Sequence, residues 1–217
     1  MNLHPWIQLL TDQFQQTTFW EWVAVILSVA EVLLAKANNL WLYPTGIAGT
    51  LISIYVLLIA GLYAESALNV YYVVMSVYGW IYWIKKRNEP PVKISWATRS
   101  EWVVTLLIVF VGWAVLYFIL KNYTKSNVPL WDSWVSSTAW AGMWLLARRK
   151  LENWILLNVS NLFAIPLLFY KKLALFGLLT VFLFIVAFAG FYQWLEIWKK
   201  DRSKVSPSGG DLEGASL

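Results

Sequence analysis

Three side chains with helical spacing form the strongest candidate for a binding site in this sequence. Trp154, Asn158 and Asn161 stand at positions i, i+4 and i+7 of an apolar segment, so a helix would place them on one face. An amide both donates and accepts hydrogen bonds, and an indole ring attracts flat or cationic rings. Polar groups at membrane depth are costly, which makes each of them a candidate site residue.

The other candidates for substrate binding are polar or aromatic side chains on the third and seventh apolar segments: Asn69, Tyr72, Trp83, Thr180, Tyr192, Gln193 and Trp194. Asn69 and Tyr72 share a helix face with Ser76. Thr180 is the counterpart of Asn69 in a second copy of the pattern. We expect Asn69 and Tyr72 to act opposite the Trp154 face, and the last three residues of the list to form a gate on the cytoplasmic side.

Each of these residues taken alone has a simpler explanation. Asn, Ser and Thr often join membrane helices, contributing roughly 0.6 kcal/mol each. Trp and Tyr gather at the two membrane interfaces. Gly79 and Gly190 fit helix contacts better than ligand contacts. For a single Asn the joining role is favoured, whereas the combination of both groups favours a binding site.

The residue types exclude most chemistry. The chain has no cysteine and one histidine, His4, so it lacks thiolate sites, histidine relays and metal centres. The apolar segments contain no nucleophile–base pair, and we expect neither catalysis nor a cofactor. Glu31 is the one carboxylate deep inside a segment, and Lys36 is too far along to pair with it ideally. Without cations between the candidates, phosphate is disfavoured. A flat, neutral or cationic molecule with hydroxyl groups fits best.

The composition indicates a membrane protein. The 217 residues are 59% hydrophobic and 13% charged, and stretches near 20 apolar residues can cross a core about 30 Å thick. Seven spans are expected, at roughly 19–36, 41–60, 66–84, 102–120, 133–147, 154–170 and 173–198. If sides alternate, four Lys and Arg residues lie on the N-terminal side and thirteen on the other. The N-terminus is then periplasmic and the C-terminus cytoplasmic. This distribution argues against a nucleic-acid partner.

Much of the chain occurs twice. The stretches beginning at Gly79 and Gly190 have similar aromatic sequences 111 residues apart, and Trp41 corresponds to Trp154 with an offset of 113. Each copy has three spans, and the extra span 102–120 restores the orientation, so the copies are parallel. We predict an all-α membrane protein with seven transmembrane helices in a 3+1+3 arrangement. That construction is typical of transporters that bind substrate between the copies.

Five parts follow from this plan: an amphipathic segment at 1–18, a three-helix repeat at 19–84, a connector helix at 102–120, a second three-helix repeat at 133–200 and a disordered tail at 201–217. The first part is either a short helix lying in the outer interface or a frayed terminus. The connector is expected at the periphery, against lipid or another copy.

Several longer motifs are specific enough to indicate a family: Leu62-Tyr63-Ala64, Leu68-Asn69-Val70-Tyr71-Tyr72, Tyr78-Gly79-Trp80-Ile81-Tyr82-Trp83, Glu152-Asn153-Trp154 followed by Asn161, and Gly190 to Trp194. They resemble the bacterial nicotinamide riboside transporters of the PnuC family, over about residues 19–200. Leu157 departs from the pattern where a second tryptophan is expected, and Asn161 stands where the family often has Asp.

This resemblance implies a SWEET-like fold and uptake of nicotinamide riboside, a vitamin B3 precursor of NAD, across the inner membrane. It implies facilitated diffusion by alternating access, a homotrimer, and trapping of the substrate by a cytoplasmic riboside kinase. The riboside is a flat cationic carboxamide with ribose hydroxyls and no phosphate, which agrees with the residues. The alternatives are a carrier for another vitamin or a sugar, such as thiamine, or a membrane enzyme or sensor.

Overall fold

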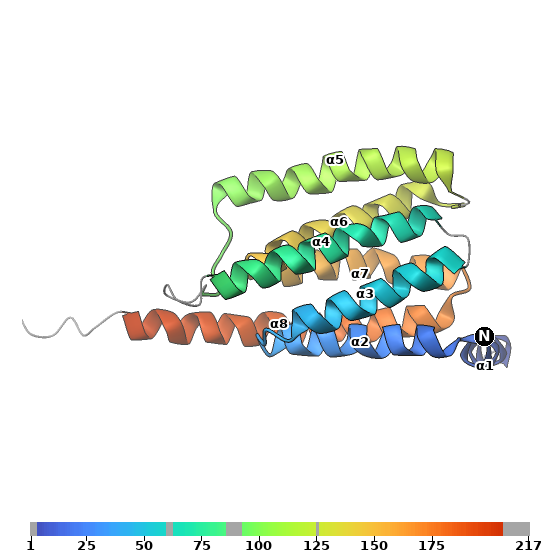
Figure 1. Cartoon of the computed structure of the whole chain (residues 1–217), viewed down its shortest axis with the longest axis horizontal. Helices are drawn as coiled ribbons and strands as arrows, with labels where there is room; N and C mark the ends of the chain where they lie inside the picture. Colours follow the sequence, from blue (N-terminus) through green and yellow to red (C-terminus); the bar gives the residue numbers. More distant parts are fainter. Residues whose placement is uncertain (1–3, 60–62, 86–92, 125, 206–217) are drawn as a thin grey trace, which may run out of the picture.

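The computed structural model describes residues 4–59, 63–85, 93–124 and 126–205. Within these ranges the chain forms eight α-helices (Figure 1). They are α1 (His4–Gln16), α2 (Phe19–Lys36), α3 (Leu42–Ile59), α4 (Tyr63–Lys85), α5 (Arg99–Tyr123), α6 (Pro129–Ala147), α7 (Asn153–Tyr170) and α8 (Ala174–Val205).

Capping boxes set the beginnings of two helices. Thr18 precedes α2 and Thr98 precedes α5, and each hydroxyl accepts a hydrogen bond from the backbone N–H three residues on. The glutamates there, Glu21 and Glu101, accept in return from the threonine N–H. A cap of this kind contributes about 1 kcal/mol, and it ends the loop where the apolar stretch begins.

Six helices pack side by side in a closed ring. α3 lies between α2 and α4, and α7 lies between α6 and α8. The first group (α2–α4) meets the second group (α6–α8) along two seams, α4 against α6 and α2 against α8 (Figure 1). α3 and α7 therefore stand on opposite sides of the ring.

The two remaining helices lie outside the ring. α5 packs along α6 at the edge of the molecule, at the top of Figure 1. α1 is bent by 105° from α2 and docks on the beginning of α8. The side chain of Gln13 bonds to the carbonyl oxygen of Lys172 and accepts from the N–H of Leu175 at 3.0 Å. The predicted amphipathic segment is thus a docked helix within its described residues.

The most densely packed core lies at the end of the ring where α2 and α6 finish. Trp83 of α4 donates from its indole N–H to the carbonyl oxygen of Ala147, the last residue of α6, at 3.1 Å. Trp194 of α8 donates to the carbonyl oxygen of Ala35 in the last turn of α2, at 2.9 Å. Both indoles are buried. Each bond joins one group of helices to the other.

Two glycines admit the aromatic rings of this core. A Cβ at Gly79 would lie 2.6 Å from the ring of Tyr43, and a Cβ at Gly190 would lie 2.7 Å from the ring of Trp154. Tyr43 is therefore the structural counterpart of Trp154, at the same offset of 111 as the glycines. The predicted pairing of Trp154 with Trp41 was wrong, since Trp41 is 67% exposed.

Four helices of the described part of the chain are long and apolar enough to cross a membrane: α3, α5, α7 and α8. The bent pair α1–α2 is a fifth candidate. α4 and α6 fall short because tyrosine, tryptophan and serine lower their mean hydropathy. The structure confirms an all-helical, multi-pass chain without confirming seven spans.

The predicted boundaries differ most at the C-terminus. α8 runs to Val205, so the helix continues into the segment predicted to be a disordered tail from residue 201. The charged residues there are good helix formers, and they extend the helix past its apolar part. Residues 206–217 lie outside the described residues.

Candidate substrate site

Helix α7 has three distinguishable sides. The hydroxyl of Ser160 donates to a backbone carbonyl of α6 at 2.8 Å, and the ring of Trp154 lies against α8. Leu162 is 56% exposed on the outer side. Helical periodicity then directs Asn161 between α6 and α8, toward the inside of the ring.

The three residues of the predicted α7 face have different environments. Trp154 is 1% exposed and meets Trp194 edge-on, with ring centroids 5.6 Å apart, so it belongs to the packed core. Asn158 has a buried Oδ1 with no hydrogen-bond donor among the described residues. Asn161 is half-buried. On this face the Oδ1 of Asn158 and the indole N–H of Trp154 are thus buried polar groups without a hydrogen-bond partner among the described residues.

A pocket of about 360 Å³ between α7 and α8 brings several predicted residues together. Trp154, Asn158 and Tyr192 line it, together with apolar side chains of both helices. Tyr192 is 63% exposed, so this pocket opens toward the outside of the ring. Asn158 is reached from this pocket, whereas Asn161 is not among its lining residues.

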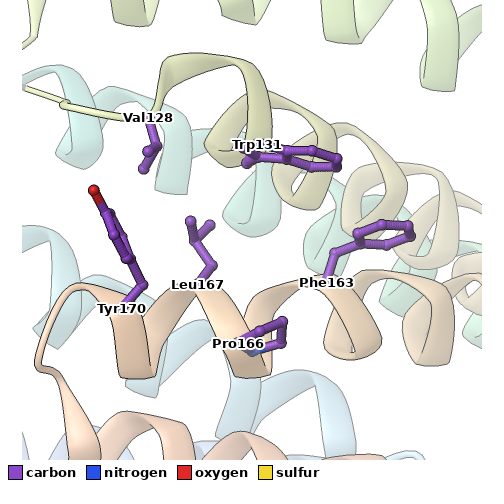
Figure 2. A pocket seen from close by; sticks show the side chains of 6 residues that line it. All are labelled: Val128, Trp131, Phe163, Pro166, Leu167 and Tyr170. Carbon is purple, nitrogen blue, oxygen red and sulfur yellow. The ribbon is translucent and has the colours of Figure 1, made fainter.

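A different pocket contains none of the predicted site residues. It measures about 390 Å³ and lies between α6 and α7, lined by Val128, Trp131, Phe163, Pro166, Leu167 and Tyr170 (Figure 2). Its lining is almost wholly apolar, and hydroxyl groups buried there would lack partners at a substantial free-energy cost. It does not suit a ligand rich in hydroxyls.

On α4, neighbouring tyrosines point to different places. Tyr71 stacks on Trp140 of α6 with centroids 4.5 Å apart and donates to its carbonyl oxygen at 3.0 Å. Tyr72 instead interacts electrostatically with Glu31 of α2. Asn69 is half-buried one turn before Tyr72.

The remaining candidates are less directly placed for binding. The hydroxyl of Thr180 donates to the carbonyl of Phe176 in its own helix at 2.8 Å. Trp83 and Trp194 are held in the hydrogen bonds that join the two groups of helices. Gln193 is half-buried between Tyr192 and Trp194. Trp83 and Trp194 therefore join helices at the end of the ring where α2 and α6 finish, which we call the closed end. The hydroxyl of Thr180 has its hydrogen-bond partner within its own helix.

Sequence reasoning gave no role to Tyr43 and no partner to Glu31. Tyr43 is 1% exposed, and its hydroxyl has no hydrogen-bond partner among the described residues. The signal that identifies it is its offset of 111 from Trp154, which the similarity of the two tryptophans concealed.

Ion pairs and hydrogen bonds to carboxylates connect the loops at the closed end of the ring. Glu101 pairs with Arg148 and with Lys150, each at 3.0 Å. The carboxylate of Glu152 accepts from the N–H of Ala97 at 2.9 and 3.0 Å. This network ties the segment before α5 to the turn between α6 and α7.

The same end also shows the repeat in its turns. Asn38 and Arg149 both have positive φ, 54° and 55°, at positions 111 residues apart. A guanidinium N–H of Arg149 donates to the side-chain oxygen of Asn38 at 2.8 Å. The equivalent turns of the two groups thus touch each other.

The described residues contain no group of three or more His, Cys, Asp or Glu side chains that could hold a metal ion. The candidate side chains on α2, α4 and α7 can form hydrogen bonds through amides and a phenol, and Glu31 adds one carboxylate.

The bundle, with its apolar helices of membrane-spanning length, places this chain among the multi-pass helical membrane proteins. The chain belongs to the nicotinamide mononucleotide transporter family, whose model matches residues 18–196. It is therefore a member of a transporter family and not an enzyme, and the predicted relation to PnuC is confirmed.

Named relatives agree with this assignment. The chain is 21% identical to the nicotinamide riboside transporter PnuC of Escherichia coli (strain K12), with 80% of this chain and 85% of the relative covered. The protein of the same name from Shigella flexneri matches to the same extent. A crystal structure of the vitamin B3 transporter PnuC superposes with a TM-score of 0.67 at 22% identity, covering 89% of this chain and 88% of the other.

Proposed function

We propose that this protein carries nicotinamide riboside across the bacterial inner membrane by facilitated diffusion. One observation carries the proposal: the candidate helices α4 and α7 offer amides and a phenol, with no Lys or Arg between Tyr63 and Ile84 or between Asn153 and Tyr170. Amides match a carboxamide and ribose hydroxyls, which donate and accept in the same way.

The choice between riboside and mononucleotide rests on the same residues. The family description names the mononucleotide, whereas the relatives from Escherichia coli and Shigella flexneri are named for the riboside. A phosphate group needs fixed positive charge or a helix N-terminus at hydrogen-bonding distance. The lack of cations between Tyr63 and Ile84 on α4 and along α7 therefore favours the riboside.

In the proposed site, Asn158 and Asn161 act from the second group of helices, and Asn69 and Tyr72 act from the first. Trp154 supports the α7 face from the core. Thr180, Tyr192 and Gln193 form a second tier along α8. Trp83 and Trp194 position the helices and do not contact the substrate in the closed state.

The proposed mechanism is alternating access in a SWEET-like 3+1+3 fold. α2–α4 and α6–α8 would be parallel repeats, and α5 the connector. The equivalent turns at Asn38 and Arg149 support this repeat. α4 and α6 would cross the membrane with their polar sides turned toward neighbouring helices. The two groups would rock about the site, with the bonds of Trp83 and Trp194 closing the cytoplasmic gate.

We propose a periplasmic N-terminus, because the cations gather at the opposite end. We propose a homotrimer, for which a detergent-corrected mass of one chain would be contrary evidence. Net accumulation would depend on phosphorylation by a cytoplasmic riboside kinase, so cells lacking that kinase should equilibrate the riboside without concentrating it.

The direct test is a binding titration of the purified full-length protein, followed by tryptophan fluorescence. Nicotinamide riboside should give a saturable change, whereas its mononucleotide and sucrose should give none at comparable concentrations. Tight binding of the mononucleotide, or no response to the riboside, would overturn the proposal. A response to thiamine alone would support the alternative of a different vitamin carrier.

A further inference from the structure

Glu31 of α2 lies within the first group of helices, in a space left by a glycine of α3. It lies on α2 on the same helical face as Ser28, one turn away, and Ala24, two turns away. Its carboxylate rests against Gly46 of α3, where the methyl group of an alanine would overlap it. Gly46 therefore leaves the space that the carboxylate occupies between α2 and α3.

No partner neutralises this carboxylate within the described part of the chain. None of the ion pairs or hydrogen bonds formed there includes Glu31. The guanidinium of Arg149 is directed elsewhere, since it donates to Asn38 and lies 3.8 Å from the ring centroid of Trp83. An unpaired carboxylate at membrane depth is costly, and such residues usually have a function.

The surroundings of Glu31 are those of the proposed site. It interacts electrostatically with Tyr43 and with Tyr72, which is one of the proposed ligand contacts. A cavity of about 280 Å³ between α2, α3 and α8 is lined by Ala24 and Ser28 on the same face of α2. Glu31 does not line this cavity itself, but it lies one turn beyond Ser28 on that face, and its charge acts on a tyrosine of the proposed site.

We propose that Glu31 supplies the counter-charge for a cationic aromatic ring and selects charged over neutral ribosides. This inference rests on the proposed function, because the pyridinium ring of nicotinamide riboside carries the positive charge. The side chains of Tyr43 and Tyr72 would contact the pyridinium ring of the ligand, and the carboxylate of Glu31 would compensate its positive charge. A neutral ring of the same shape would leave the carboxylate unpaired.

The experiment compares nicotinamide riboside with benzamide riboside, a neutral ligand of nearly the same shape, by isothermal titration calorimetry. The proteins are the parent, Glu31→Gln and the matched control Glu196→Gln, whose side chain is exposed on α8. The parent and the control should prefer the charged riboside by about tenfold or more, because the attraction within one charge pair at an effective dielectric constant of ~20 is partly offset by the desolvation of both charges. Glu31→Gln should bind both ligands about equally.

Equal binding of the two ligands by the parent would overturn the inference, and this result needs no variant. An unchanged preference in Glu31→Gln would overturn it as well. In both cases binding of nicotinamide riboside would leave the proposed function standing. A parent that binds neither riboside would instead overturn the proposed function and this inference with it.

Discussion

Asn158 illustrates how a single residue separates a binding role from a packing role. Its Oδ1 is buried without a hydrogen-bond donor among the described residues, an arrangement that costs roughly 1–3 kcal/mol. Ser160, two positions on, is more deeply buried and donates to the carbonyl of Val135. The Oδ1 of Asn158 can therefore accept a hydrogen bond from a ligand, whereas the hydroxyl of Ser160 joins α7 to α6.

We expect Asn158→Leu to weaken riboside binding by about tenfold, because the ligand loses one to two hydrogen bonds. The same change should keep or raise the melting temperature, since it removes an unpaired buried oxygen. Ser160→Ala should do the opposite, lowering the melting temperature and leaving affinity unchanged. Calorimetry and thermal unfolding of both variants measure this, and a less stable Asn158→Leu with parental affinity would reveal a purely structural residue.

Residue spacing predicted this face only in part. The i, i+4, i+7 pattern predicted one face with Trp154, Asn158 and Asn161, and in the structure Trp154 and Asn158 line the same pocket while Asn161 does not. It could not show that Gly190 of another helix leaves room for the Trp154 ring. Whether an aromatic ring binds a ligand or fills a core depends on a residue distant in the sequence.

At the scale of helices, the lengths of the apolar segments predicted where helices form better than they predicted which residues of the two repeats correspond. α2 has the predicted bounds, whereas α6 begins at Pro129 instead of 133 because proline suits the first turn of a helix. The repeat was aligned on matching tryptophans, and the structure aligns Tyr43 with Trp154. That alignment follows from the aromatic rings that pack on Gly79 and Gly190, and residue identity alone did not show it.

Gly190→Ala should destabilise the protein by roughly 1–3 kcal/mol, because the new methyl group would press on the ring of Trp154. Gly112→Ala on α5 is the matched control. Its Cβ would lie 3.7 Å from its nearest neighbour, the Cβ of Ser137, so the usual helix preference for alanine should keep or raise stability. Thermal unfolding compares them, and equal melting temperatures would contradict the tight α7–α8 contact.

Trp194→Phe should loosen the closed end, because it removes the hydrogen bond to Ala35 and keeps most of the apolar contact. A net loss of about 1 kcal/mol corresponds to roughly a fivefold shift toward the open state. The chain has no cysteine, so Ser76→Cys, at a site 1% exposed, can report opening by its rate of thiol labelling.

The labelling rate of Ser76→Cys should rise about fivefold when Trp194→Phe is added. Trp41→Phe, at a 67% exposed site, should leave the rate unchanged. Equal rates in all three backgrounds would remove Trp194 from the proposed gate.

At the scale of the whole molecule, the distribution of Lys and Arg predicts the orientation in the membrane, and the closed ring of six helices surrounds the proposed site. The cation count could be made from the sequence, because the positive-inside rule depends only on loop composition. Closure of the ring could not, since the seams of α4 with α6 and α2 with α8 join segments far apart in the chain. Glu31 remained without a role in the sequence for the same reason.

Single cysteines test the orientation. Asn122→Cys at the end of α5 should react with a membrane-impermeant maleimide in intact spheroplasts. Ser203→Cys on α8 should react only after the membrane is permeabilised. Both native side chains are exposed, so access to the reagent depends on the side of the membrane. The reverse pattern would place the N-terminus in the cytoplasm.

The most direct measurement of the central claim is uptake of labelled nicotinamide riboside into proteoliposomes that contain only this protein. With no ion gradient or nucleotide, we expect saturable uptake that stops when inside and outside concentrations are equal, and no comparable uptake of the mononucleotide. Uptake of riboside no faster than in protein-free liposomes, or uptake of the mononucleotide at the same rate, would contradict it.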